Sequence, residues 1–378
     1  MKQIRHRTGA VTEMEQTTAK KNKYEIDMCN GTIMDKLISF SLPLMLSGIL
    51  QLMFNAVDII VVGRFSGSQA LAAVGSTSAL INVFTNLFIG ISLGANVLTA
   101  RFYAAGREKE VSETVHTAIT LALVSGIVMA LVGLVFSKGA LALMGTPDDV
   151  IGLSALYMRI YFLGMPFFML YNYGAAILRA VGDTKRPLLF LMIAGVINAC
   201  LNMVLVIVFK LGVAGVAIAT VISQMISCVL VLRCLCRSES SYRLRFSELG
   251  MKGYYLKQIF SVGVPAGIQS TVINFSNVLL QSSVNSFGST AMAGYTAANN
   301  LLGFLYVSVN SITQACMSFT SQNYGVGKLK RMDRVLADCM ILSVVVAVVL
   351  GCICYGFGPE ILQIYTEDAE VIACGMEI

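Results

Sequence analysis

The sequence predicts an all-α membrane protein that crosses the bilayer many times. Of its 378 residues, 56% are hydrophobic and only 13% are charged, and the mean hydropathy is +0.75. A soluble chain of this length needs far more surface charge, whereas a bilayer requires repeated spans of about 20 apolar residues. The apolar runs are continuous and much longer than the alternating segments of about 10 residues in a transmembrane barrel, so we expect helices.

The apolar runs follow one another with short polar connections. Before them, residues 1–32 are polar and basic and lack the apolar core and cleavage site of a signal peptide, so we expect a disordered cytoplasmic tail. A tenth run begins near Ala369. We place the first nine spans at residues 37–62, 70–99, 115–136, 151–173, 188–209, 213–232, 256–287, 291–320 and 335–357.

Lys and Arg residues predict the orientation, because cytoplasmic loops retain them. With the N-terminus inside, the outer side receives Arg64, Lys138 and Lys210, Arg159 falls within a span, and the others of the 27 basic residues lie inside. The net charge of +6 therefore reflects topology and does not indicate a nucleic-acid partner. We expect a multi-pass protein of the inner (cell) membrane that acts as a monomer.

The chain repeats itself at a nearly constant offset. Pro43 and Asn55 recur as Pro265 and Asn277, both 222 residues later. The six spans between equivalent positions predict two parallel bundles related by a pseudo-two-fold axis along the membrane normal, with a substrate site between them. Chance agreement between two apolar stretches is the alternative. We divide the chain into the tail, an N-terminal six-helix lobe (33–235), a cytoplasmic linker (236–255) and an incomplete C-terminal lobe (256–378).

An aspartate, Asp58, lies inside the first span. An ionisable side chain in the hydrocarbon region costs several kcal/mol, so it usually faces a polar cavity and binds, pairs with or carries an ion. The alternative is a carboxylate that pairs with Arg159 inside the bundle and has no part in transport. Asp58 is therefore the strongest functional candidate in the chain.

Neutral polar side chains in the spans predict a substrate cavity between the lobes. They would offer hydrogen bonds among aromatic and methionine side chains to a bulky, amphipathic cation, although each could instead serve only interhelical packing. We expect no enzyme, because no nucleophile and base pair occurs at span depth, and no metal site, because the cysteine spacings are poor for zinc. The cavity candidates are Gln51, Asn55, Asn172, Asn277 and Gln281.

Three segments resemble one known family. Residues 51–64, which read QLMFNAVDIIVVGR, are similar to the first-span signature of the multidrug and toxic-compound extrusion (MATE) transporters. Residues 176–187 (AILRAVGDTKRP) resemble the loop that these proteins carry between spans 4 and 5, and residues 212–224 (GVAGVAIATVISQ) resemble their sixth span. The resemblance covers the chain from about residue 33 to its end.

The resemblance implies a secondary exporter with two six-helix lobes, so the second lobe is expected to be truncated in this chain. Export would be coupled to H⁺ or Na⁺ by alternating access, with no other cofactor. A flippase of lipid-linked precursors with the same two-lobe architecture is the alternative, but it should carry several Lys or Arg in its cavity. Carried over residue by residue, the coupling site, and the Na⁺ site if sodium is used, falls on Asp58, Asn198, Asn202 and Thr220, where Asn202 replaces a second carboxylate of the family pattern.

Overall fold

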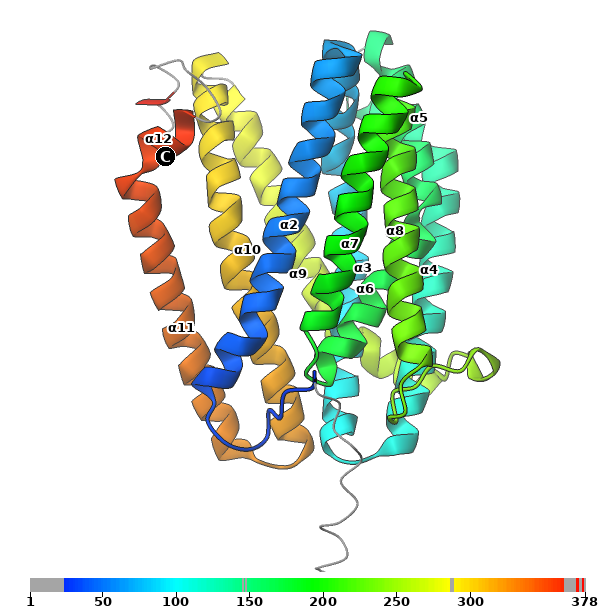
Figure 1. Cartoon of the computed structure of the whole chain (residues 1–378), viewed down its shortest axis with the longest axis vertical. Helices are drawn as coiled ribbons and strands as arrows, with labels where there is room; N and C mark the ends of the chain where they lie inside the picture. The colour runs from blue at the N-terminus through cyan, green and yellow to red at the C-terminus, as the bar shows by residue number, and fades with distance from the viewer. Residues whose placement is uncertain are drawn as a thin grey trace, which may run out of the picture.

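The computed structural model describes residues 24–144, 146, 148–285, 289–363, 372–373 and 376, and its regular structure is helical throughout. This confirms the predicted all-α fold. The helices stand side by side as long, nearly parallel rods (Figure 1). In chain order they are α2 (Met34–Ser66), α3 (Ser68–Ala104), α4 (Glu108–Leu143), α5 (Asp148–Leu163), α6 (Met165–Ala180), α7 (Lys185–Asn202), the π-helical turn η1 (Met203–Val208), α8 (Gly212–Cys236), the 3-10 turn η2 (Phe246–Glu248), α9 (Gly253–Asn285), α10 (Ser289–Gly325), α11 (Leu329–Gly356) and α12 (Gly358–Gln363).

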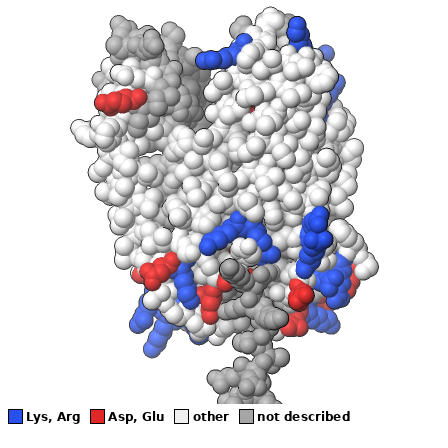
Figure 2. All heavy atoms as spheres, in the orientation of Figure 1, with Lys and Arg blue, Asp and Glu red and all other residues white. Residues whose placement is uncertain are grey.

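Six of the described helices are long and apolar enough to cross a membrane alone, and the bent α5 and α6 pair makes a seventh. Helices α9 and α10, of 33 and 37 residues, contain more polar side chains and run beside the others (Figure 1). The tenth span expected near Ala369 lies outside the described residues. Charged side chains gather mainly at one end of the bundle (Figure 2), which we call the basic end.

The structure adds to one expectation about local structure and corrects another. The fourth span, placed at residues 151–173, is broken at Gly164 into α5 and α6, which meet at a 48° bend. Pro166 explains the break, since it has no backbone N–H to donate and its ring crowds the preceding turn. Residues 24–32, expected to belong to a disordered tail, instead pack against the bundle, and the Met28 side chain is fully buried. Residues 1–23 of that tail lie outside the described residues.

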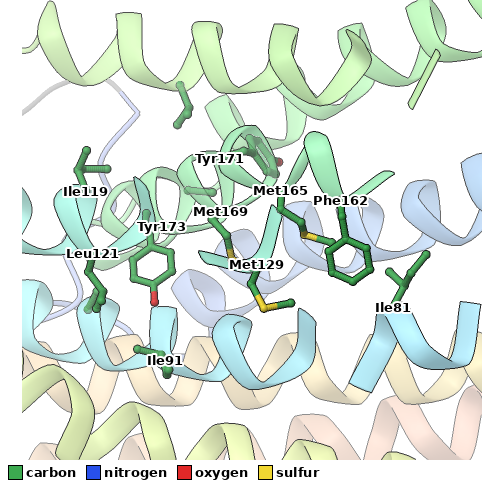
Figure 3. Packing of buried hydrophobic residues seen from close by; sticks show 14 of the residues in the cluster. Ile81, Ile91, Ile119, Leu121, Met129, Phe162, Met165, Met169, Tyr171 and Tyr173 are labelled. Atoms are coloured by element: carbon green, nitrogen blue, oxygen red, sulfur yellow. The ribbon is translucent and has the colours of Figure 1, made fainter. Parts of the chain in front are cut away.

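The largest apolar core lies among helices α3, α4, α5, α6 and α8. Phe162, Met165 and Met169 near the α5–α6 break pack toward Met129 of α4 (Figure 3), and each is at most 3% exposed. Gly126 on α4 allows the close approach, because a Cβ there would meet the Pro166 Cα at 2.5 Å. The broken span is thus fixed in place by packing against its neighbours.

Helix α2 links the two halves of the molecule. At the basic end it packs on α10 and α11, where Leu37 and Phe40 join Phe319 in a second buried cluster, and the Phe40 and Phe319 rings meet edge to face at 5.6 Å. Farther along, α2 crosses to the other side and contacts α7 and α8 (Figure 1). The helix therefore belongs to the C-terminal lobe at one end by its packing and to the N-terminal lobe at the other.

Helices α3 and α9 form the other crossing between the lobes, through two glycine pairs. Gly90 and Gly94 on α3 face Gly263 and Gly267 on α9, with the i, i+4 spacing that lets helix backbones touch in membranes. A Cβ on Gly90 would lie 2.2 Å from the Gly267 Cα, and one on Gly94 would lie 2.2 Å from the Ile259 carbonyl oxygen. Under the repeat, α2 corresponds to α9 and α3 to α10, so the α2–α10 and α3–α9 crossings are pseudo-symmetric counterparts.

We predict that Gly94→Ala destabilises the protein, because the new methyl group meets backbone atoms that cannot rotate away; overpacking of this kind costs about 1–3 kcal/mol. The matched control is Gly139→Ala on α4, where a Cβ meets no atom within 4 Å and the higher helix propensity of alanine favours folding. Thermal unfolding of the detergent-solubilised variants measures both. Equal melting temperatures for the two variants would refute the tight crossing.

Candidate functional site

Asp58 lies in the half of α2 farthest from the basic end and is only 8% exposed. Its Oδ1 accepts a short hydrogen bond from Asn202 Nδ2, and its Oδ2 lies 3.3 Å from the donating Thr220 hydroxyl. No ion pair joins Asp58 to Arg159 among the described residues, and Arg159 is exposed. The carboxyl group is thus surrounded by neutral hydrogen-bond donors.

The four residues expected at the ion site lie together. Asn198 and Asn202 share one face of α7, and Asn202 Nδ2 donates to Asn198 Oδ1 at 3.1 Å. Asn198 Nδ2 lies 3.5 Å from the Thr220 hydroxyl on α8, which closes a ring of side chains around Asp58. Within the part of the chain that the structure describes, the Asn202 Oδ1 atom is buried and has no hydrogen-bond partner.

Local backbone structure places these groups. Asn202 is the last residue of α7, and the chain continues directly into the wider π-helical turn η1 over Met203–Val208. Such turns interrupt the regular hydrogen-bond ladder and occur often at functional sites. The Thr220 side chain is oriented by its own helix, because its hydroxyl also lies 2.9 Å from the Val216 carbonyl oxygen.

A cavity of about 320 Å³ opens beside Asp58, between helices of the N-terminal lobe. Its lining is mostly neutral and polar, and among the described residues Asp58 is the only carboxylate that lines it. No Lys or Arg lies among the described residues that line it, so it offers no cationic cradle for a diphosphate. The lining consists of Gln51, Phe54, Asn55, Asp58, Asn82, Thr85, Asn86, Ile89, Tyr157, Tyr161, Phe168, Tyr171, Leu191, Ala194, Gly195, Asn198, Thr220, Ser223, Gln224 and Ser227.

The five residues expected in a substrate cavity do not all meet. Gln51 and Asn55 line the cavity beside Asp58. Asn172 does not, because its amide donates to the Phe168 carbonyl oxygen of its own helix at 2.8 Å. Asn277 lies exposed on α9 in the other lobe, and the Gln281 side chain is outside the described part of the structure.

Several lining residues were missed by the sequence reasoning, and helical spacing could have revealed them. Tyr157 and Tyr161 are four residues apart on α5, and Thr220 and Gln224 are four apart on α8. Polar side chains at i and i+4 lie on one face of a helix, so each pair marks a polar stripe within an apolar span. The buried Gln224 Oε1 atom has no hydrogen-bond partner among the described residues.

The chain resembles known proteins in sequence. The MatE family model matches residues 43–204 and 265–378. A probable multidrug resistance protein of Bacillus subtilis, YoeA, is 34% identical over 342 residues, which cover 88% of this chain and 73% of that protein. The multidrug export protein MepA of Staphylococcus aureus is 22% identical over 89% of this chain and 74% of its own length.

Solved structures share the fold. An outward-facing multidrug resistance MATE family transporter of the MOP superfamily superposes with a TM-score of 0.88 at 21% identity, over 95% of this chain and 80% of that one. A MOP superfamily transporter from Pyrococcus furiosus gives a TM-score of 0.87 at 20% identity, with the same coverage. The family model and the Bacillus relative are decisive, and the chain belongs to the MATE family of membrane transporters.

Proposed function

We propose that this chain is an ion-coupled multidrug exporter of the MATE family in which Asp58 carries the coupling ion. The observation that supports this most is the arrangement around Asp58: a lone carboxyl group in the membrane, ringed by neutral donors and open to a polar cavity. Placing a charge in the membrane costs free energy, so ionisable residues are rare there, and intramembrane acids commonly serve as ion or proton carriers.

We further propose that the coupling ion is a proton. Asn202 donates an amide N–H to Asp58, and the Thr220 hydroxyl, which the Val216 carbonyl oxygen shares, lies within hydrogen-bond distance of the second carboxyl oxygen. An amide N–H directed at the carboxyl group suits an ionised carboxylate with no cation bound. A protonated carboxyl group would instead donate, and Asn202 could meet it by turning its amide so that Oδ1 accepts. Sodium would need several oxygen ligands, which Asp58, Asn198, Asn202 and Thr220 could supply only after such a rotation.

In the proposed cycle, proton binding and drug binding compete through the same cavity. Neutral amide and phenol groups would hold an amphipathic cation by hydrogen bonds and aromatic contact, and the ionised Asp58 would attract its charge. Protonation of Asp58 removes that attraction and favours release. We place the basic end in the cytoplasm, because cytoplasmic segments retain Lys and Arg.

Alternating access between two lobe arrangements is the remaining part of the proposal. The crossings at Gly90 and Gly94 on α3, and at Phe40 on α2, lie between the middle of the bundle and its basic end. In this arrangement the lobes meet at the end we assign to the cytoplasm, which corresponds to a state closed on that side. A flippase is not favoured, because the cavity lining has no Lys or Arg among the described residues.

We predict that Asp58→Asn abolishes export driven by a pH gradient, because asparagine is nearly isosteric but cannot exchange a proton. The assay is efflux of a fluorescent cationic dye from vesicles containing the reconstituted protein, with a pH gradient or a sodium gradient imposed in turn. Asp35→Asn, an exposed carboxylate at the start of the same helix, is the control and should transport like the wild type. Transport by wild type under the sodium gradient alone would overturn the choice of proton.

We also predict that Gln51→Leu and Asn55→Leu weaken dye transport mainly through KM, by about 10-fold or less, since each removes one neutral hydrogen bond worth about 0.5–1.5 kcal/mol. Asn172→Leu is the matched control, because its amide is satisfied within α6 and does not line the cavity. A larger rise in KM for Asn172→Leu than for the other two variants would argue against this cavity as the drug site.

A further inference from the structure

The segment before α2 crosses the basic end of the molecule and contacts both lobes. We call residues 24–33 the strap; it forms the dark blue loop below α2 in Figure 1. The sequence gives no reason to expect order there, because the segment precedes the first apolar run. Its hydrogen bonds nevertheless reach α3, the α6–α7 connection, the linker between the lobes, α10 and α11.

One end of the strap is held by the N-terminal lobe through polar contacts. Glu25 lies between two tyrosines, and its carboxylate oxygens accept hydrogen bonds from the Tyr103 and Tyr242 hydroxyls, each at 2.8 Å. The Ile26 backbone N–H donates to the Gly182 carbonyl oxygen at 3.2 Å. Gly182 has a φ of +99°, and a Cβ there would lie 2.6 Å from the Ile26 carbonyl oxygen, so the strap passes directly over this glycine.

The other end of the strap is held by the C-terminal lobe. The Met28 side chain is fully buried in the cluster formed with α10 and α11, and its carbonyl oxygen accepts from Asn323 Nδ2 at 3.1 Å. The Lys328 ammonium group donates to the Cys29 carbonyl oxygen at 2.9 Å and to Asn30 Oδ1 at 2.8 Å. This end combines apolar burial with hydrogen bonds, and it leads into α2, which packs on the same lobe.

We propose that the strap is a latch that holds the basic end closed and releases at Glu25 when the lobes separate there. The two attachments differ in kind: the attachment at Glu25 consists of hydrogen bonds that water can replace, whereas release of Met28 would expose its whole apolar side chain. The inference rests on the proposed alternating access, because it assigns the strap to one of the two lobe arrangements.

The direct contacts between the lobes at this end support a role for the strap. Gln322 on α10 donates to the Ala180 carbonyl oxygen at 2.7 Å, and the Arg101 guanidinium lies 4.8 Å from the Tyr324 ring centroid. These contacts join the same two lobes that the strap bridges. Opening the basic end therefore requires Glu25 and Ile26 to leave the N-terminal lobe, or Met28 to leave the C-terminal lobe.

The test is the distance between the lobes at the basic end, which does not depend on drug, dye or ion gradient. Spin labels are attached at Lys109→Cys on α4 and Lys330→Cys on α11, both exposed positions, after the ten native cysteines have been replaced. Pulsed electron paramagnetic resonance in lipid nanodiscs then gives the populations of closed and separated lobes. If the proposed proton coupling is wrong, the vesicle assay will show it, and the distance measurement still tests the latch.

We expect Glu25→Ala to raise the ratio of separated to closed lobes by about tenfold, as expected for the loss of hydrogen bonds to a charged group. Gly182→Ala should raise the ratio as well, because its methyl group would meet the Ile26 carbonyl oxygen and push the strap off the N-terminal lobe. The control Glu239→Gln removes an exposed carboxylate of the linker that does not contact the strap and should leave the ratio unchanged. Gly106→Ala is the backbone control, because Gly106 also has a positive φ (+68°) but a Cβ there meets nothing within 4 Å.

An unchanged distance distribution in both strap variants would overturn the latch, and so would an equal shift in the two controls. If Glu25→Ala does not fold, Tyr103→Phe combined with Tyr242→Phe removes only the two hydroxyl groups that bind Glu25. The double variant should then show the same shift toward separated lobes. A double variant that folds and stays closed counts against the proposal equally.

Discussion

The burial of one carboxyl group, that of Asp58, is the constraint that the surrounding part of the N-terminal lobe must satisfy. Asp58 is almost completely removed from solvent, yet no described basic side chain neutralises it. Isolated ionised groups are expensive in an apolar environment, so the protein must supply donors at fixed positions or let the group take up a proton. Asn202 at the end of α7 and the Thr220 hydroxyl on α8 supply such donors.

Helix α2 connects this site to the contact between the lobes. Near its start, Leu37 and Phe40 pack on α10 and α11, and the strap joins it there, while its far half carries Asp58 against α7 and α8. Asp58 and the residues that pack at the basic end therefore lie on the same helix, which would carry a change at one to the other. The glycine crossing of α3 and α9 supplies the second fixed contact about which the lobes would turn.

The sequence was sufficient to predict the helices and their approximate positions, because a chain of continuous apolar runs joined by basic connections can adopt few other structures in a bilayer. Asp58 was identified because a charged side chain is unfavourable within an apolar span. Its three partners were named through the family resemblance, and the structure adds that the four side chains contact one another. The break at Gly164 was not located from the sequence, because the chain is similarly apolar on both sides of it. The strap was missed because its few apolar residues, such as Ile26 and Met28, alternate with polar ones, and burial by distant helices leaves no local pattern.

The most direct test of the account is whether drug binding displaces a proton from Asp58. Purified protein in weakly buffered detergent solution is mixed with a cationic dye at a pH where about half of the Asp58 carboxyl groups are protonated. A pH indicator reports the protons that are released. Competition at one carboxyl group predicts release of up to about half a proton per chain from the wild type at that pH and no release from Asp58→Asn. Equal release from both proteins would contradict the assignment of Asp58 as the coupling residue.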